Sequence, residues 1–247
     1  MSRKPVDPVP PGAVSESRRG FLRHTLAVVP AAGLLATPLA GCAPDDAGAA
    51  SAERAADYAP RYFNPAEWAF VTAAVDRLIP ADDVGPGALE LGVAEFIDRE
   101  MESDYGHGGL WYMQGPFVPD TPPTLGYQLR FTPRELYRSG IAAVDRWCRA
   151  QHGGPFAELD DAGRDAALSQ LEAGSAELDG VPAQAFFALL LQNTKEGYFA
   201  DPMYGGNRGM GSWKMIGFPG ARADFMDWAE QPGAVYPFGP VSLRREG

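Results

Sequence analysis

Cysteine and histidine are scarce in this sequence, which has two cysteines and three histidines among 247 residues. No Cys-x-x-Cys-His is present, so we do not expect the chain to carry its own c-type haem. His107 and His152 have no second histidine or cysteine at ligand spacing and are interpreted as surface residues. A Ser/His/Asp set cannot be assembled around them, and no Gly-x-Ser-x-Gly occurs. The sequence therefore predicts no catalytic, cofactor-binding or metal-binding residue.

Long apolar runs are also missing from the N-terminal region. The uncharged stretch from Leu26 to Ala40 has 15 residues and is interrupted by Pro30 and Pro38. A membrane-spanning helix needs roughly 20 apolar residues, so we do not expect a permanent transmembrane helix here.

A paired-arginine motif precedes that stretch, in Ser17-Arg18-Arg19-Gly20-Phe21-Leu22-Arg23. The arginine pair followed by Phe21, Leu22 and an apolar run is typical of a twin-arginine signal, which exports folded proteins. An ordinary Sec-type leader with a basic front is the alternative interpretation.

The leader ends in Leu39-Ala40-Gly41-Cys42, which resembles a lipoprotein cleavage box. Small residues before Cys42 also suit an ordinary signal peptidase, so lipidation of Cys42 is one of two possibilities. We predict a leader over residues 1–41, a flexible tether rich in Ala, Asp and Gly over 42–60, and a folded domain over 61–247. The expected location is the periplasm, with a lipid anchor in the membrane.

The predicted mature chain is acidic. The first 41 residues hold five of the 21 Lys and Arg residues and two of the 32 Asp and Glu residues, which leaves a net charge of −14 beyond them. This charge argues against nucleic-acid binding and against adhesion to anionic lipid. Cys148 would be a single thiol in an oxidising compartment, either paired with another chain or buried and inert.

Apolar residues at helical spacing, with capping residues before them, predict an all-α domain of five or six helices. No stretch alternates apolar and polar residues as a strand would. The expected helices cover residues 64–80, 88–102, 132–151, a short segment after 160, 182–196 and 221–230.

Two connections, Tyr105–Phe131 and Tyr198–Gly220, are long and rich in aromatic residues, Gly or Pro. Their aromatic content predicts order, either as coverage of the core or as a surface for a partner. The glycines after Tyr204 are interpreted as tight turns rather than as a phosphate loop, and Asp201 as a loop cap. The residues of the candidate interface are Trp111, Tyr112, Tyr198, Phe199, Tyr204, Arg208 and Trp213.

Four segments of the chain resemble one family. The segments are Glu196 to Arg208, Trp213 to Gly220, Trp111 to Phe117, and Gly140 to Arg146. They are similar to the small (gamma) subunit, subunit 3, of membrane-bound gluconate 2-dehydrogenase and related periplasmic flavoprotein dehydrogenases. The resemblance runs from about Asn64 to Trp228 and includes the twin-arginine leader.

The resemblance implies a heterotrimer. A large FAD-bearing subunit of the glucose-methanol-choline type oxidises a sugar or sugar acid, and a multihaem cytochrome c subunit passes electrons onward. The small subunit holds no cofactor; it escorts the leaderless large subunit through the twin-arginine translocase and stabilises it. In related complexes a disulfide can link the two, and Cys148 is the candidate here. The alternative is an independent exported lipoprotein enzyme or ligand-binding protein, with a pocket between the two long loops.

Overall fold

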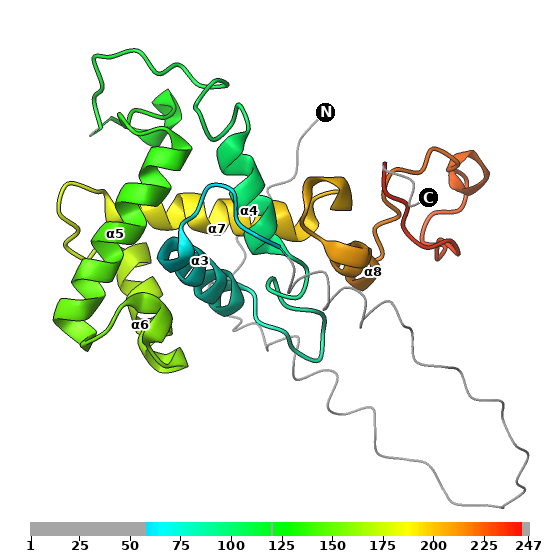
Figure 1. Ribbon diagram of the computed structural model, residues 1–247. Helices are drawn as coiled ribbons and strands as arrows, with labels where there is room; N and C mark the ends of the chain where they lie inside the picture. The colour runs from blue at the N-terminus through cyan, green and yellow to red at the C-terminus, as the bar shows by residue number, and fades with distance from the viewer. Residues whose placement is uncertain (1–57, 120, 244–247) are drawn as a thin grey trace, which may run out of the picture. The chain divides into compact units, whose positions relative to one another are not determined.

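A computed structural model describes residues 58–119 and 121–243 (Figure 1), all within the unit of residues 45–247. The export residues Arg18, Arg19, Phe21 and Leu22 lie outside the described residues, as does Cys42. The leader, the lipid anchor and most of the tether therefore stay predictions.

Two helices begin at capping boxes that the sequence predicts. Helix α3 (Pro65–Leu78) starts after Asn64, whose side chain accepts the N–H groups of Ala66 and Glu67, each at 3.0 Å. Helix α5 (Pro133–His152) starts after Thr132, whose N–H donates to the Glu135 carboxylate at 2.8 Å. These bonds satisfy N–H groups that have no partner inside the first helical turn, so both helices begin at defined residues.

The other α-helices are α4 (Val93–Glu102), α6 (Asp161–Ala173), α7 (Ala183–Phe199) and α8 (Gly211–Ile216). Asp160 caps α6 by accepting the N–H of Gly163 at 2.8 Å, as the sequence predicts. The described residues thus contain six α-helices and no strand, only an isolated bridge between Gly220 and Val241. The all-α prediction is confirmed.

Two predictions of secondary structure are wrong in detail. The helix expected over 88–102 begins only at Val93, because Gly92 adopts a left-handed φ of 73°. The helix expected over 221–230 is reduced to a 3-10 turn, Met226–Trp228. Most residues of that segment are exposed, and a helix this short is marginal in water without a surface to pack on.

Helix α7 lies at the centre of the helical body and packs against α3, α4, α5 and α6 (Figure 1). Its Phe186 ring lies 6.0 Å from Phe70 of α3 and 6.1 Å from Tyr137 of α5. A Cβ on Gly140 would come within 2.2 Å of the Phe186 ring, so this glycine lets α5 approach α7. Burying each phenylalanine contributes about 1.5–3 kcal/mol, which makes this aromatic cluster a main source of stability.

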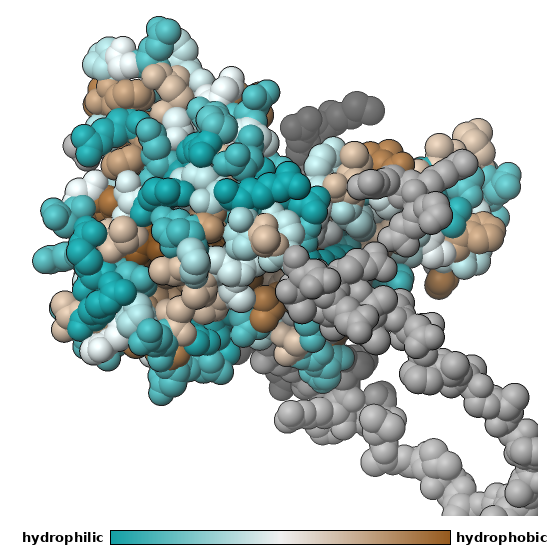
Figure 2. All heavy atoms as spheres, viewed as in Figure 1, coloured by the Kyte–Doolittle hydropathy of each residue, from teal (hydrophilic) through white to brown (hydrophobic). Residues whose placement is uncertain are grey.

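The surface of the helical body is mostly polar. Figure 2 shows hydrophilic side chains over most of the body's visible face. Helices α3 to α6 carry no exposed large hydrophobic residue, and α7 carries one only at its last position, Phe199. Among the described residues, no helix combines the length and apolar character needed to cross a membrane.

Candidate functional site

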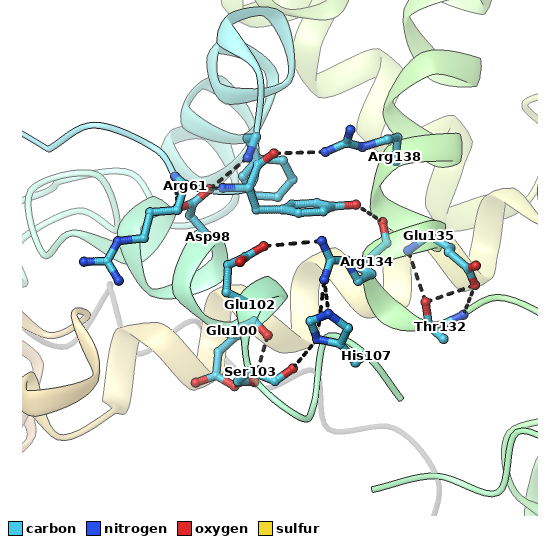
Figure 3. Close-up of polar contacts among 12 residues, drawn as sticks. Arg61, Asp98, Glu100, Glu102, Ser103, His107, Thr132, Arg134, Glu135 and Arg138 are labelled. Carbon is cyan, nitrogen blue, oxygen red and sulfur yellow. Dashed lines mark hydrogen bonds and ion pairs between the residues drawn. The ribbon is translucent and has the colours of Figure 1, made fainter. Parts of the chain in front are cut away.

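A buried carboxylate on α4, that of Asp98, binds the backbone of the residues that precede α3 (Figure 3). Asp98 is fully buried and accepts the N–H groups of Arg61 at 2.7 Å, Tyr62 at 3.1 Å and Phe63 at 3.0 Å. It also accepts the hydroxyl of Tyr58 at 2.7 Å. Burial, together with Asp98, raises the pKa of Tyr58, so this hydroxyl stays protonated as a donor. The four bonds fix the end of the predicted tether to the helical body.

Two arginines of α5, Arg134 and Arg138 (Figure 3), lie close to the ring of Tyr62. The guanidinium carbons of Arg134 and Arg138 lie 4.6 Å and 4.4 Å from the ring centre, close enough for cation–π attraction. A hollow of about 560 Å³ opens beside them. Both guanidiniums already contact other groups of the chain. Arg134 pairs with Glu102 at 3.3 Å and contacts His107, and Arg138 pairs with Glu67 at 3.3 Å. The cluster therefore stabilises the fold and is not arranged as an anion site.

The glycine-rich block after α7 is organised by Asn207. This residue is fully buried in a left-handed conformation, with φ 46°. Its amide donates to the carbonyl of Ala200 at 2.9 Å, and its oxygen accepts the N–H of Ser212 at 3.0 Å and the hydroxyl at 2.8 Å. Asn207 therefore ties the end of α7 to the start of α8. Gly205 and Gly209 have positive φ, as the interpretation of the glycines as tight turns predicts.

Arg208 connects the same block to α4. Its N–H donates to the carbonyl of Leu91 at 3.1 Å, and its guanidinium pairs with the buried carboxylate of Glu95, which also pairs with Arg99. A Cβ on Gly206 would lie 2.1 Å from the carbonyl oxygen of Gly197, so only glycine permits this approach. The most distinctive stretch of the sequence therefore has a structural role, joining α4, α7 and α8.

The seven residues predicted as an interface divide into buried and accessible sets. Tyr198 and Trp213 are buried, and they donate to the carbonyls of Pro86 and Phe199, each at 2.8 Å. The Arg208 guanidinium forms an ion pair with Glu95, and the Trp111 ring packs on the Tyr127 ring, with the ring centres 4.4 Å apart. Three side chains remain well exposed: Tyr112, Phe199 and Tyr204. A partner can reach these three, and the interface itself stays a prediction.

A cavity of about 410 Å³ lies within the first long loop, among residues 111–128. Trp111, Phe117 and Tyr127 supply aromatic walls, and Gln114 and Gln128 supply amides. Burial raises the pKa of Tyr127 to about 12, so it is not an acid–base group near neutral pH. The second long loop contributes no lining residue, which differs from the pocket between the loops that the sequence suggests.

Sequence reasoning missed an exposed apolar region near the C-terminus. Met226 is 84% exposed and Val235 is 88% exposed, and Phe225, Phe238 and Leu243 are also exposed. The only signal in the sequence was the alternation of aromatic residues with Pro and Gly after residue 217.

Cys148 lies on α5 and is fully buried, and burial raises the pKa of its thiol to about 12. An intersubunit disulfide through Cys148 stays a prediction, and it would require this thiol to become accessible. Across residues 58–119 and 121–243, no group of three or more His, Cys, Asp or Glu side chains is placed to hold a metal ion.

The fold and the site define a small all-helical domain whose hydrophobic exposure is gathered outside its helical body, a pattern typical of subunits that contact other proteins. The chain belongs to the gluconate 2-dehydrogenase subunit 3 family, whose model matches residues 65–220. It is therefore subunit 3 of a gluconate 2-dehydrogenase-type complex. No curated protein and no solved structure matches the chain.

Proposed function

We propose that this chain is the non-catalytic small subunit of a periplasmic, membrane-bound dehydrogenase complex. It escorts a leaderless FAD-bearing subunit through the twin-arginine pathway and stabilises that subunit afterwards. The observation that carries the proposal is the Arg18-Arg19 motif at the front of a subunit 3 family member. A pathway that transports folded proteins can transport a bound companion as well.

The proposed partners supply the redox chemistry. A flavoprotein of the glucose-methanol-choline type binds FAD and oxidises gluconate or a related sugar acid. A multihaem cytochrome c subunit receives the electrons. A lipid on Cys42 holds the assembly at the inner membrane, with residues 43–57 as spacer. Support comes from the family match and from the absence of a haem-binding motif in the sequence.

The surface of the domain supports a role in binding another protein subunit. The helical body is polar outside, whereas large apolar side chains are exposed in the first long loop and between residues 199 and 243. Monomeric proteins rarely expose extended apolar patches, and such patches commonly mark protein interfaces. A stable subunit contact typically buries at least about 1,200 Å² in total, and we expect the contact with the large subunit to be of that order.

The test replaces Arg18 and Arg19 with lysines in the native host and follows both chains by cell fractionation. Arg23→Lys, which lies outside the pair, is the matched control. We expect the Arg18→Lys/Arg19→Lys variant to leave this chain and the flavoprotein together in the cytosol, while the control exports both. Normal export of the flavoprotein in the double variant would refute the escort role.

Lipidation of Cys42 is tested separately with Cys42→Ser. The expected result is that the chain and its flavoprotein move from the membrane fraction to the soluble periplasm. Retention of the variant in the membrane without a lipid would show that another subunit supplies the anchor.

One observation favours a second candidate, a ligand-binding lipoprotein. The aromatic and amide lining of the cavity at residues 111–128 resembles sites where sugars stack on rings. Calorimetry of the purified chain with gluconate and related sugar acids tests it, with Trp111→Ala as the matched variant. Saturable binding that this substitution abolishes would support the second candidate; no heat of binding at millimolar ligand would exclude it.

A further inference from the structure

Residues 221–240, which we name the C-terminal loop, are closed at both ends by hydrogen bonds. The N–H of Ala221 donates to the carbonyl of Val241 at 2.7 Å, and the N–H of Val241 donates to the carbonyl of Pro219 at 3.1 Å. The two ends of the loop therefore lie side by side, at the isolated bridge between Gly220 and Val241.

Asp201 attaches that closed end to the helical body. Its carboxylate accepts the hydroxyl of Ser242 at 2.5 Å and the N–H of Leu243 at 2.8 Å, while also accepting the N–H of Met203 at 3.1 Å. Asp201 belongs to the distinctive block at the end of α7, so the loop is attached to the block that joins α4, α7 and α8. A loop fixed in this way loses less conformational freedom when it binds.

The interior of the C-terminal loop is a small aromatic cluster. The Tyr236 ring lies 5.3 Å from Phe225, 5.7 Å from Trp228 and 5.5 Å from Phe238. The Arg222 guanidinium lies 5.2 Å from the Phe238 ring. These contacts give the loop a shape of its own, yet Phe225 and Phe238 remain exposed and none of these side chains joins the core.

Many of the exposed large apolar residues among those described lie between residues 199 and 243. Some belong to the loop, and others to the segments before and after it. These residues are Phe199, Met203, Tyr204, Ile216, Phe218 and Leu243, in addition to Phe225, Met226, Val235 and Phe238. Aromatic residues and methionine are enriched in the cores of protein interfaces.

We infer that the C-terminal loop docks into an apolar groove on the large flavoprotein subunit of the complex, and that Asp201 positions it. This inference rests on the proposed function. The loop lies beyond residues 65–220, the part shared with the family, so it would fit the chain's own flavoprotein in particular.

The charge of this segment argues against a membrane surface as the binding partner of the loop. Between residues 217 and 247 the sequence has three arginines against two aspartates and two glutamates, a net charge of −1, and Arg222 lies near Asp224 at 3.5 Å. Anionic lipid attracts strongly basic segments, whereas this segment has no net positive charge. The groove on the flavoprotein is therefore expected to be apolar with basic residues at its rim.

Photo-crosslinking in the intact complex tests the contact. A benzophenone amino acid replaces Met226 in the full chain expressed in the native host, and Glu172 of α6, also exposed, is replaced as the control. We expect illumination to link position 226, but not position 172, to the flavoprotein. Links from position 226 only to a second copy of this chain, to the cytochrome subunit or to phospholipid would overturn the inference.

A matched pair of variants then measures the effect. The loop variant combines Met226→Ser, Val235→Ser and Phe238→Ser, and the control combines Glu172→Ser, Ala173→Ser and Glu177→Ser, exposed residues at and after the end of α6 that lie outside both regions proposed for contact. Flavoprotein captured with this chain from solubilised membranes should fall at least roughly tenfold in the loop variant, and much less in the control. Equal capture by both variants would contradict the inference.

The design separates the two hypotheses. The loop variant keeps its leader, so it should reach the periplasm while its flavoprotein stays in the cytosol. Should the arginine substitutions strand the flavoprotein while the loop variant exports it normally, the escort role stands and the docking site is wrong. Export of the flavoprotein in both cases would refute the proposed function itself. Thermal unfolding of the purified loop variant should match that of the control, because the loop adds no core residue.

Discussion

The helical body and the C-terminal segment use the same kinds of residue in opposite ways. In the body, Phe70, Phe156 and Phe186 are completely buried, and Phe70 contacts the other two, whereas Phe218, Phe225 and Phe238 in the C-terminal segment are all exposed. The body is therefore stabilised by burial of apolar area, and the segment by turns and hydrogen bonds. Large apolar side chains that the domain does not bury for its own folding are free for contact with another protein.

The largest effect should come from truncating the central aromatic cluster. We expect Phe186→Ala to lower the free energy of unfolding by about 3–5 kcal/mol, because it leaves a cavity among Phe70, Tyr137 and Gly140. The matched change Phe238→Ala in the C-terminal loop should cost less than about 1 kcal/mol. Urea unfolding of the purified chain measures both. Similar losses for the two variants would show that the loop is part of the cooperative core.

The next effect compares two aspartates that each fix a chain segment. Asp98→Asn puts an amide NH₂ where one carboxylate oxygen now accepts two donors, so we expect a loss of about 2–3 kcal/mol in unfolding free energy. Asp201→Asn should leave global stability nearly unchanged and release only the end of the C-terminal loop. Urea unfolding gives the first result, and faster amide exchange at Leu243 gives the second. Faster exchange throughout α7 in the Asp201 variant would contradict the comparison.

Asp201 also makes the loop attachment sensitive to acid. Burial raises the pKa of Asp201, but the bonds from Ser242, Leu243 and Met203 outweigh it, and the folded-state pKa lies below its ordinary value. The attachment therefore has its full strength above the unfolded pKa of about 4 and is lost as pH falls through the folded value. Exchange at Leu243, corrected for the intrinsic rate, should rise only in that acidic range. A change between pH 6 and 8 would contradict this assignment.

Most of the helical body was predictable from local sequence, and much of the site was not. Caps at Asn64, Thr132 and Asp160 fix helix starts through bonds within three residues, so the sequence alone indicates them. The pairing of Arg208 with Glu95 joins residues 113 positions apart, and no local pattern predicts it. The segment 221–230 has helical spacing but no core to pack against, which is why its predicted helix is absent.

Two glycines of the two regions, Gly206 and Gly239, differ in the space around them. Gly206→Ala should lower the free energy of unfolding by about 1–3 kcal/mol, because its Cβ would meet the Gly197 carbonyl oxygen at 2.1 Å, and the backbone must shift. Gly239→Ala in the C-terminal loop meets nothing within 4 Å and should be neutral or slightly stabilising. Thermal unfolding of the two variants measures the difference. Equal midpoints would show that the block around Asn207 can relax, against the tight packing described above.

The smallest effect concerns accessibility rather than stability, and it compares thiols in the two regions. Cys148 is fully buried, and burial raises the pKa of its thiol to about 12, so at pH 8 Cys148 of the native chain should react with an alkylating reagent only as fast as α5 opens. A thiol introduced by Ala229→Cys in the exposed loop should react at the rate of a free peptide. Mass spectrometry of timed samples measures both rates. If Cys148 reacts as fast as position 229, α5 opens readily, and a partner cysteine could then form the predicted intersubunit disulfide without prior unfolding.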